Sequence, residues 1–335
     1  ATISIAITNF ALNSGTQLTE NTTTSANMKA STAFSNFNNN WGQSGLSVQN
    51  PLEVGNFHRA AGYGLTGSGI QVAIVDTNFD PNHLELSEKT ITLYKEYFGA
   101  TSTKYHGLSV SGIIAADGDL LRGATPDVSL HWTQYDCIPT VNAGCTSPAA
   151  NMVEQLTLGT ADASSAKVQN NSWGFDTSEI DEEIALMSTN SWTNYQVLAN
   201  RMLGSTGSDA IEDVTNYISA LNSFQNHGVI VFSNSNCGAS RAGGPNCNYG
   251  TASDNAEITA ALPELFPELA EAFIAAVNVE IDGAVGSETY TLMSAPCGDA
   301  AKYCLSGDGT HNTTLKGGNG YSSGSGTSYA APQIT

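Results

Sequence analysis

Short apolar runs that alternate with stretches of helical periodicity place the strongest constraint on the fold of this chain. The clearest run, Ile70 to Val75 (IQVAIV), is typical of a buried parallel strand. Similar strand-like runs occupy residues 128–132, 167–171, 229–232 and 273–279. We therefore predict an α/β fold, with a mostly parallel central sheet and helices on both of its faces.

Two stretches between these runs have apolar residues at helical spacing. Residues 107–116 form one of them. Residues 209–221 form the other, with acidic residues in the first turn, where the helix dipole favours negative charge. Both stretches are predicted to be helices that cover the sheet.

The composition of the chain changes near Asn50. Residues 1–50 are polar and rich in Asn, Thr and Ser, and segments such as Asn21 to Thr24 indicate an extended loop or arm. The chain has 335 residues and 40% hydrophobic content, which suffices for one large core or two modest domains. We predict an N-terminal arm or extension over 1–50 and a folded domain over 51–335.

The charge balance excludes two classes of partner. Eleven basic residues face 31 acidic ones, which gives a formal net charge of −20. Such a surface repels nucleic acid and anionic membranes, and it suits a salty or extracellular medium. Alternatively, the acidic surface would attract Ca²⁺ or cationic substrates. No apolar run approaches the ~20 residues that a membrane helix needs, so we expect no transmembrane segment in this chain.

The six cysteines fall into three close pairs, although six cysteines allow ~15 pairings in principle. Local pairing is the simplest, because each bond would close one surface loop. No spacing favours zinc. Three disulfides would imply an oxidising compartment, and we expect a secreted, periplasmic or cell-surface protein. The candidate pairs are Cys137 with Cys145, Cys237 with Cys247, and Cys297 with Cys304.

Three polar residues have settings that suit nucleophilic catalysis. Ser328 lies between a Gly-Thr pair and a run of small residues that can open a helix, where backbone N–H groups favour a developing negative charge. Asp76 ends the strand 70–75, and functional groups gather at such strand ends. His106 begins the predicted helix 107–116. Each residue alone has a plain structural alternative: a loop serine, a loop-capping aspartate or a structural histidine.

These segments resemble the motifs of the subtilisin-like serine proteases, the subtilases. The stretch GTSYAAP around Ser328 is similar to the nucleophile motif GTSMAxP, and GIQVAIVDT around Asp76 is similar to the aspartate motif. The stretch YHGLSVSGI around His106 is similar to GHGTHVAGI. The order Asp76, His106, Ser328 is the subtilisin order, and three ordered motifs are far more specific than one.

The resemblance implies a serine endopeptidase that acts on polypeptides and needs no cofactor for catalysis. Asp76 would orient His106, and His106 would take the proton of Ser328. Asn236, in SNSNCG, matches the position of the oxyanion-hole amide; Asn234 is a rival that lacks the family's spacing to the next glycine. The stretch Ser172-Trp173-Gly174 would pair with extended substrate and form a wall of the S1 pocket.

Five positions depart from the family motifs, and one of them is Ser235, which replaces the glycine before Asn236. Asn78 replaces a glycine after the aspartate, and asparagine tolerates left-handed backbone better than most residues. Tyr105, Leu108 and Ser109 replace Gly, Thr and His around His106, and we expect them to alter packing and the rim of the site without removing the base. These departures leave open a second class of function, a catalytically inactive domain used for adhesion or scaffolding. A metal-dependent hydrolase is a weaker third alternative.

Two other motifs lack the required context. The stretch GYSSG at 320–324 matches the nucleophile elbow of α/β-hydrolases, but those enzymes place their histidine after the serine, and none follows Ser322. The glycines at 62, 64 and 67 match a dinucleotide fingerprint but precede their strand, whereas the fingerprint follows it.

A further resemblance concerns the region before the nucleophile. The stretch LPELFPEL at 262–269, together with the cysteines at 297 and 304, is similar to the subtilase passenger domains of Gram-negative autotransporters. This implies bacterial origin. Because the few residues after Ser328 make only about two helical turns, whereas the family's helix continues, we also expect the polypeptide to continue past Thr335, as a separate segment or towards an autotransporter barrel. Ca²⁺ is common in subtilases, but no ligand spacing assigns a site here. The loop carboxylates that could contribute are Asp80, Asp117, Asp119, Asp176 and Asp181.

Overall fold

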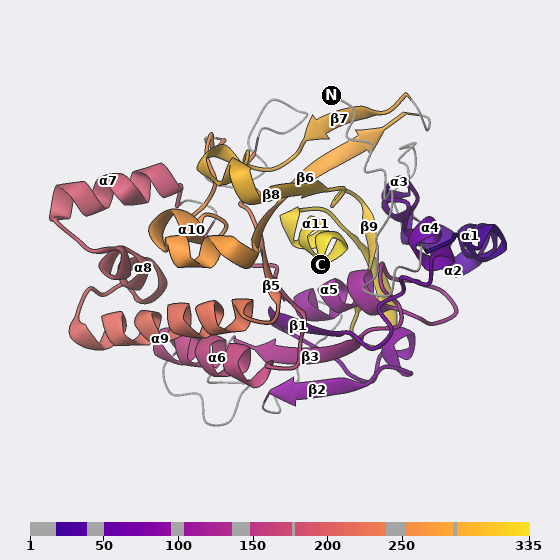
Figure 1. The fold of residues 1–335 in the computed structure, drawn as a ribbon, viewed down its shortest axis with the longest axis horizontal. Helices are drawn as coiled ribbons and strands as arrows, with labels where there is room; N and C mark the ends of the chain where they lie inside the picture. Colours follow the sequence, from indigo (N-terminus) through magenta and orange to yellow (C-terminus); the bar gives the residue numbers. More distant parts are fainter. Residues whose placement is uncertain are drawn as a thin grey trace.

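A computed structural model describes residues 18–38, 50–94, 104–135, 148–175, 178–238, 252–283 and 287–335 (Figure 1). The helices are α1 (Thr22–Lys29), α2 (Thr32–Ser35), α3 (Pro51–Val54), α4 (Phe57–Gly62), α5 (His106–Ala115), α6 (Pro148–Asp162), α7 (Ile180–Asn190), α8 (Asn194–Leu203), α9 (Ser208–Gln225), α10 (Leu262–Leu265) and α11 (Thr327–Ile334). The strands are β1 (Gln71–Asp76), β2 (Ile91–Tyr94), β3 (Ser129–Gln134), β4 (Val168–Asn171), β5 (Val229–Ser233), β6 (Phe273–Asp282), β7 (Thr289–Leu292), β8 (Cys304–Gly307), β9 (Asn312–Lys316) and β10 (Gly320–Gly324). Four short 3₁₀ helices complete the elements: η1 (Asn36–Asn38), η2 (Leu84–Leu86), η3 (Pro267–Ala272) and η4 (Gly298–Tyr303).

The central sheet has the strand order β2-β3-β1-β4-β5-β6-β7, and β8 also pairs with β6. Its pairs are parallel except for β6 with β7, which are antiparallel. The α/β class and the mostly parallel sheet predicted from the sequence are therefore confirmed.

Both faces of the sheet are buried, because alternate residues of each strand enter different cores. Ala73 and Val75 of β1 enter one core with residues of α6, α8 and α9. Val72 and Ile74 enter the opposite core with residues of α5. This two-sided burial explains why the inner strands are continuous apolar runs rather than alternating polar and apolar ones.

The helices form two layers around the sheet, as Figure 1 shows. The helices α6 and α9 lie against each other on one side, with α7 and α8 next to them. On the other side α5 contacts α11, and Ala331 of α11 packs on Val231 of β5 and Ala276 of β6. The expectation of helices on both faces is thus confirmed.

The strand register brings the carboxyl ends of the inner strands to one edge. Residue Val75 of β1 pairs with Asn171 of β4, and Asn171 pairs in turn with Phe232 of β5. The residues that follow these pairs, at positions 76, 172 and 233, therefore meet at the same edge of the sheet. Neighbouring parallel strands lie about 4.8 Å apart, so residues distant in sequence become neighbours there.

The described part of the N-terminal segment is helical, which corrects the expectation of an extended loop at Asn21 to Thr24. Asn21 caps α1 by accepting a hydrogen bond from Thr24 N (3.1 Å). Phe34 and Phe37 are buried in the core that contains α5. The polar composition hid these helices, because the apolar side chains that anchor them are few and widely spaced.

The hairpin of β9 and β10 lies beside α5 and contains the GYSSG motif. Residues 320–324 form strand β10, so Ser322 is not on a strand-to-helix turn of the hydrolase kind. Ser109 of α5 donates to Leu315 O of β9 (2.9 Å), and a Cβ on Gly112 would lie 2.5 Å from the Leu315 side chain. Close helix–hairpin packing therefore explains Ser109 and requires the glycine.

The cysteines are described in part. Cys297 and Cys304 form a disulfide, as predicted, and Cys237 is also disulfide-bonded. The predicted partner of Cys237, Cys247, lies outside the described residues. The same is true of the predicted pair Cys137 and Cys145. Among the helices that the structure describes, none has the length and apolar character needed to cross a membrane.

Candidate active site

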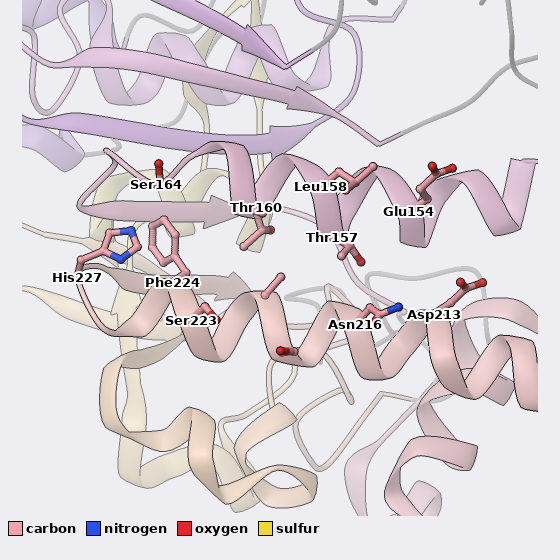
Figure 2. Close-up of a pocket in the computed structure, with 13 residues that line it drawn as sticks. Glu154, Thr157, Leu158, Thr160, Ser164, Asp213, Asn216, Ser223, Phe224 and His227 are labelled. Carbon is pink, nitrogen blue, oxygen red and sulfur yellow. The ribbon is translucent and has the colours of Figure 1, made fainter.

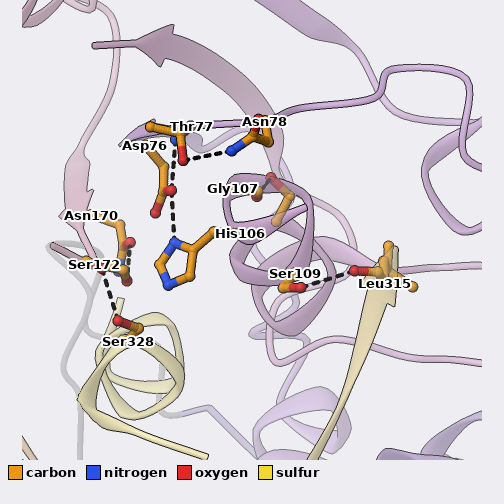
Figure 3. A network of polar contacts seen from close by, with 11 residues as sticks. Asp76, Thr77, Asn78, His106, Gly107, Ser109, Asn170, Ser172, Leu315 and Ser328 are labelled. Carbon is orange, nitrogen blue, oxygen red and sulfur yellow. Dashed lines mark hydrogen bonds and ion pairs between the residues drawn. The ribbon is translucent and has the colours of Figure 1, made fainter. Parts of the chain in front are cut away.

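Asp76 lies at the end of β1, and its side chain is fully buried. Its Oδ1 accepts hydrogen bonds from Thr77 N (2.6 Å) and from Nδ1 of His106 (2.7 Å), as Figure 3 shows. A histidine whose Nδ1–H is held by a carboxylate presents its Nε2 lone pair on the opposite side of the ring. The imidazole is therefore oriented as a general base.

His106 is the first residue of α5, and the loop after Asp76 caps this helix. Gly107 N donates to Thr77 O (2.6 Å), and Leu108 N donates to Asn78 O (3.3 Å). These bonds satisfy N–H groups that have no partner inside the helix. Asn78 has a φ of 59°, so the replacement of glycine by asparagine keeps the left-handed backbone that the sequence led us to expect.

The pKa of His106 is raised above its ordinary value of 6.5. Burial opposes the charged imidazolium, but the charge of Asp76 and its hydrogen bond together outweigh this effect. The side chain still has 36% of its surface exposed, on the side of the cavity described below. The pair is thus arranged to accept a proton and to stabilise the resulting cation.

The departures around His106 are packing changes. Leu108 is fully buried in the core beside α5. Tyr105 donates its hydroxyl hydrogen bond to Ser322 Oγ of the hairpin (3.3 Å). Ser109 joins α5 to β9 through its bond to Leu315. None of the three replaced residues displaces the contact between His106 and Asp76.

Ser328 lies in the first turn of α11, directly after Thr327. Its hydroxyl donates to Ser172 O (2.9 Å), and no hydrogen bond joins it to His106 in the described part of the chain. Figure 3 shows the His106 ring between Asp76 and Ser328. The nucleophile candidate and the base candidate therefore share one space, with the hydroxyl turned towards the Ser172 carbonyl group.

Asn236 faces the start of the same helix. Its Oδ1 accepts hydrogen bonds from Thr327 N (2.9 Å) and from Thr327 Oγ1 (3.1 Å). Because the carbonyl end of the amide is turned to Thr327, the Nδ2 group forms its donor end. The rival Asn234 uses its own amide elsewhere: Nδ2 donates to Ala295 O and Pro296 O, at 3.1 and 2.9 Å.

Gly326 makes this arrangement possible. Its φ of 149° with a ψ of 171° belongs to a region that glycine alone adopts readily. A Cβ at this position would also lie 2.8 Å from Asn236 Oδ1. The glycine therefore lets the backbone enter α11 in contact with the Asn236 amide.

A cavity of about 250 Å³ unites these groups. It brings together most of the site residues expected from the sequence: His106, Ser172, Trp173, Gly174, Asn236 and Ser328. Thr77, Tyr135, Ser233 and Asn234 also line it and were not predicted as lining. Trp173 packs between the rings of Tyr135 (5.1 Å) and Phe232 (5.3 Å). The only sequence signal that could have identified Tyr135 and Ser233 as lining residues was their position at the ends of strands.

A larger groove of about 560 Å³ lies between α6 and α9, away from these residues (Figure 2). Glu154 and Asp213 lie near one end and His227 near the other. Burial and the charges of Glu212, Asp209 and Glu154 raise the pKa of Asp213. The groove contains none of the motif residues.

A second histidine–carboxylate pair is also separate from the cavity. His131 Nε2 lies 2.9 Å from Asp162 Oδ2 and joins β3 to the end of α6. His131 is buried, and neither residue lines the cavity. This pair links a helix to the sheet.

Those of the carboxylates considered for Ca²⁺ that lie in the described ranges do not form a cluster for a metal ion. Asp117 forms ion pairs with Arg122 (2.8 Å) and Lys89 (3.5 Å), and Asp80 accepts from Asn82 N (2.9 Å). Asp176 lies outside the described residues. Within the described ranges, no group of three or more His, Cys, Asp or Glu side chains is arranged to hold a metal ion.

Comparisons with known proteins agree with this architecture. The model of the subtilase family (peptidase S8) matches residues 67–335. The structure of sphericase is similar with a TM-score of 0.50 and 18% identity, over 80% of this chain and 75% of that one. A mutant of the protease domain of PatA has a TM-score of 0.50 and 16% identity, over 80% of this chain and 77% of that one. No curated protein sequence matches the chain.

The two structures share the fold at low identity, whereas the family match extends over most of the chain, including the three motif segments. This chain therefore belongs to the subtilase family and is a serine endopeptidase of the subtilisin type.

Proposed function

We propose that the chain hydrolyses peptide bonds through Asp76, His106 and Ser328. His106 Nε2 removes the proton of Ser328 Oγ as this oxygen attacks the substrate carbonyl carbon. The tetrahedral intermediate collapses, the peptide C–N bond breaks, and His106 gives its proton to the leaving amine. Water, deprotonated by His106, then attacks the acyl-enzyme, and the acid product leaves as Ser328 regains its proton.

The Asp76–His106 contact of 2.7 Å is the observation that carries this proposal. The imidazole gains a positive charge when it takes the proton, and the buried carboxylate stabilises that charge at short range. The raised pKa of His106 has the same cause. The carboxylate also keeps the imidazole in the tautomer whose Nε2 faces the cavity.

The oxyanion would form between Asn236 and the start of α11. The Asn236 Nδ2 group and the backbone N–H of Ser328 are the proposed donors, and the helix dipole favours negative charge at that end. The bond from Thr327 N to Asn236 Oδ1 sets the orientation of the amide before substrate binds. A preoriented donor costs no reorganisation during the reaction.

Peptide substrate would lie in an extended conformation along Ser172-Trp173-Gly174, the stretch that directly follows β4. Ser172 O, which accepts the Ser328 hydroxyl group in this structure, would then be an acceptor for a substrate N–H. Competition for that carbonyl oxygen would release the hydroxyl group towards His106. Catalytic hydrogen bonds that are absent from a ligand-free site often form only in the substrate complex.

The resting contact between Ser328 and Ser172 is also what a catalytically inactive domain would show. A fluorophosphonate probe separates the two functions, because it phosphonylates a serine only when a base activates it. We expect labelling and peptide hydrolysis by the unaltered chain and neither by Ser328→Ala. Ser322→Ala is the matched control and should keep both. An unlabelled chain that nevertheless folds would establish the inactive alternative.

We further propose that the protein acts outside the cytoplasm, as a secreted or cell-surface bacterial protease. The Cys297–Cys304 disulfide and the formal charge of −20 support this location. The autotransporter origin belongs to the same proposal and rests on the motif resemblance alone. The proposed chemistry requires no metal at the reacting atoms, so hydrolysis at saturating substrate should be retained after chelation if any bound Ca²⁺ is purely structural.

A further inference from the structure

Glu257 is a buried carboxyl group to which the proposed chemistry assigns no step. It lies between β5 and α10, and only 1% of its surface is exposed. Its Oε1 accepts hydrogen bonds from the Thr259 hydroxyl group and from Ala260 N (3.2 Å). Burying a carboxylate is costly unless several donors compensate, so the position of this group is closely determined by its neighbours.

One bond connects Glu257 to the first wall of the cavity. Phe175 N donates to Glu257 Oε2 (3.0 Å), directly after Ser172-Trp173-Gly174. A Cβ on Gly174 would lie only 2.3 Å from Glu257 Oε1, so the carboxyl group sits against the backbone of that wall. Gly174 is exposed towards the cavity on its other side.

A second bond connects Glu257 to another part of the cavity lining, after the neighbouring strand β5. Its backbone N–H donates to Asn234 Oδ1 (2.9 Å), and Asn234 lines the cavity after β5. Asn234 O in turn accepts the hydroxyl hydrogen bond of Thr327 (2.6 Å), the residue before the nucleophile. Glu257 therefore bonds both to the residue after the substrate-binding stretch and to Asn234, which in turn contacts the residue before the nucleophile.

We propose that Glu257 is a positioning residue that sets the width of the peptide-binding cleft of this protease. The inference rests on the proposed function, because it takes Ser172-Trp173-Gly174 as the stretch that pairs with substrate. Glu257 touches neither the substrate nor the reacting atoms. Its carboxylate acts through Phe175, while its backbone N–H keeps the bond to Asn234, so loss of the carboxylate weakens peptide binding more than it slows the chemical step.

The role assigned to Glu257 requires the ionised carboxylate, which predominates above pH 7. Burial raises the pKa of its carboxyl group to about 7. The three groups that donate to the carboxylate are uncharged, namely two peptide N–H groups and a hydroxyl group. A carboxylate can accept from all three, whereas an amide at the same place offers one oxygen and brings two donors of its own.

The test compares Glu257→Gln with the unaltered chain, using fluorescein-labelled casein as substrate. We expect KM to rise about tenfold, the scale of one hydrogen bond to a charged group, while kcat stays within about twofold. Asp308→Asn is the matched control. Asp308 is also buried with its pKa raised to about 7, but it bonds to Thr310 and Ile281 and does not line the cavity.

A binding measurement separates this proposal from the proposed catalysis. In a Ser328→Ala background, Glu257→Gln should raise the Kd for labelled casein, measured by fluorescence anisotropy, by the same factor. An unchanged Kd would overturn the positioning role, even if the protease is active. A raised Kd in a chain that never cleaves casein would refute the catalytic function and leave the positioning role standing. If Glu257→Gln does not fold, Gly174→Ala perturbs the same contact from the cleft side, and an unchanged Kd there is equally decisive.

Discussion

Gly326→Ala tests the geometry of the site most directly, because one methyl group disturbs two features at once. The backbone of Gly326 has φ 149° and ψ 171°, and holding an alanine there costs ~1–3 kcal/mol. The added Cβ would also lie 2.8 Å from Asn236 Oδ1, a distance that requires something to move. The start of α11 and the Asn236 amide must therefore separate.

The expected effect on activity is much larger than the effect on stability. A loss of ~1–3 kcal/mol leaves a domain of ordinary stability folded, since such domains have ~5–15 kcal/mol. Displacing Asn236 removes one oxyanion donor, and in subtilisin the loss of such a donor lowers kcat by ~100- to 1000-fold. We expect Gly326→Ala to lower kcat by about this factor.

Gly318→Ala is the control for backbone strain alone. Gly318 has a φ of 75° in the turn between β9 and β10, and a Cβ there meets no atom within 4 Å. Urea unfolding should show a loss of ~1 kcal/mol with unchanged kcat. Steady-state hydrolysis of casein by both variants completes the test. A Gly326→Ala protein with wild-type kcat would refute the assignment of Asn236 and of the helix start.

The pH dependence, the disulfide and the buried glutamate give three more tests. The value of kcat/KM should fall as the pH drops through a midpoint above 6.5, because the base must be neutral and Asp76 raises the pKa of His106. A midpoint below 6.5 in the unaltered chain would contradict this. So would an Asp76→Asn variant with the same midpoint as the unaltered chain. Replacing Cys297 and Cys304 by serine should lower the free energy of unfolding by about 2–3 kcal/mol in urea, from the entropy of the short loop they close; equal midpoints would argue against it. Between pH 4.5 and about pH 7 the folded state keeps the Glu257 proton, whereas the unfolded chain loses it. The free energy of unfolding should therefore fall by up to ~3 kcal/mol as the pH rises through this window. The Glu257→Gln variant should lack this fall.

The local parts of the site were readable from the sequence. The strand ending in Asp76 and the helix opening at His106 were both predicted, because buried strands and amphipathic helices leave short-range patterns. Asparagine was expected to be a mild replacement for the glycine at position 78, and the left-handed backbone of Asn78 agrees with this. The family match over 67–335 confirms the resemblance on which the site residues were chosen.

The helices near the N-terminus were not readable in this way. The segment around Asn21 is polar, and its apolar anchors Phe34 and Phe37 have no periodic neighbours. They become buried only because the sheet and α5 supply an apolar surface for them. Tertiary contact, rather than local propensity, stabilises short helices of this kind.

By itself, the sequence determined the class of fold, the order of the three motif residues and the chemistry they could perform. These depend on residue type, spacing and short-range pattern. Only the tertiary structure decided that Ser328 rests on the Ser172 carbonyl group, that Asn236 turns its carbonyl end to Thr327, and that Glu257 bonds to both Phe175 and Asn234. Each of these contacts is a hydrogen bond between residues of different elements or loops that lie far apart along the chain. Its partners are selected by the packing of the sheet and helices, which no local pattern records.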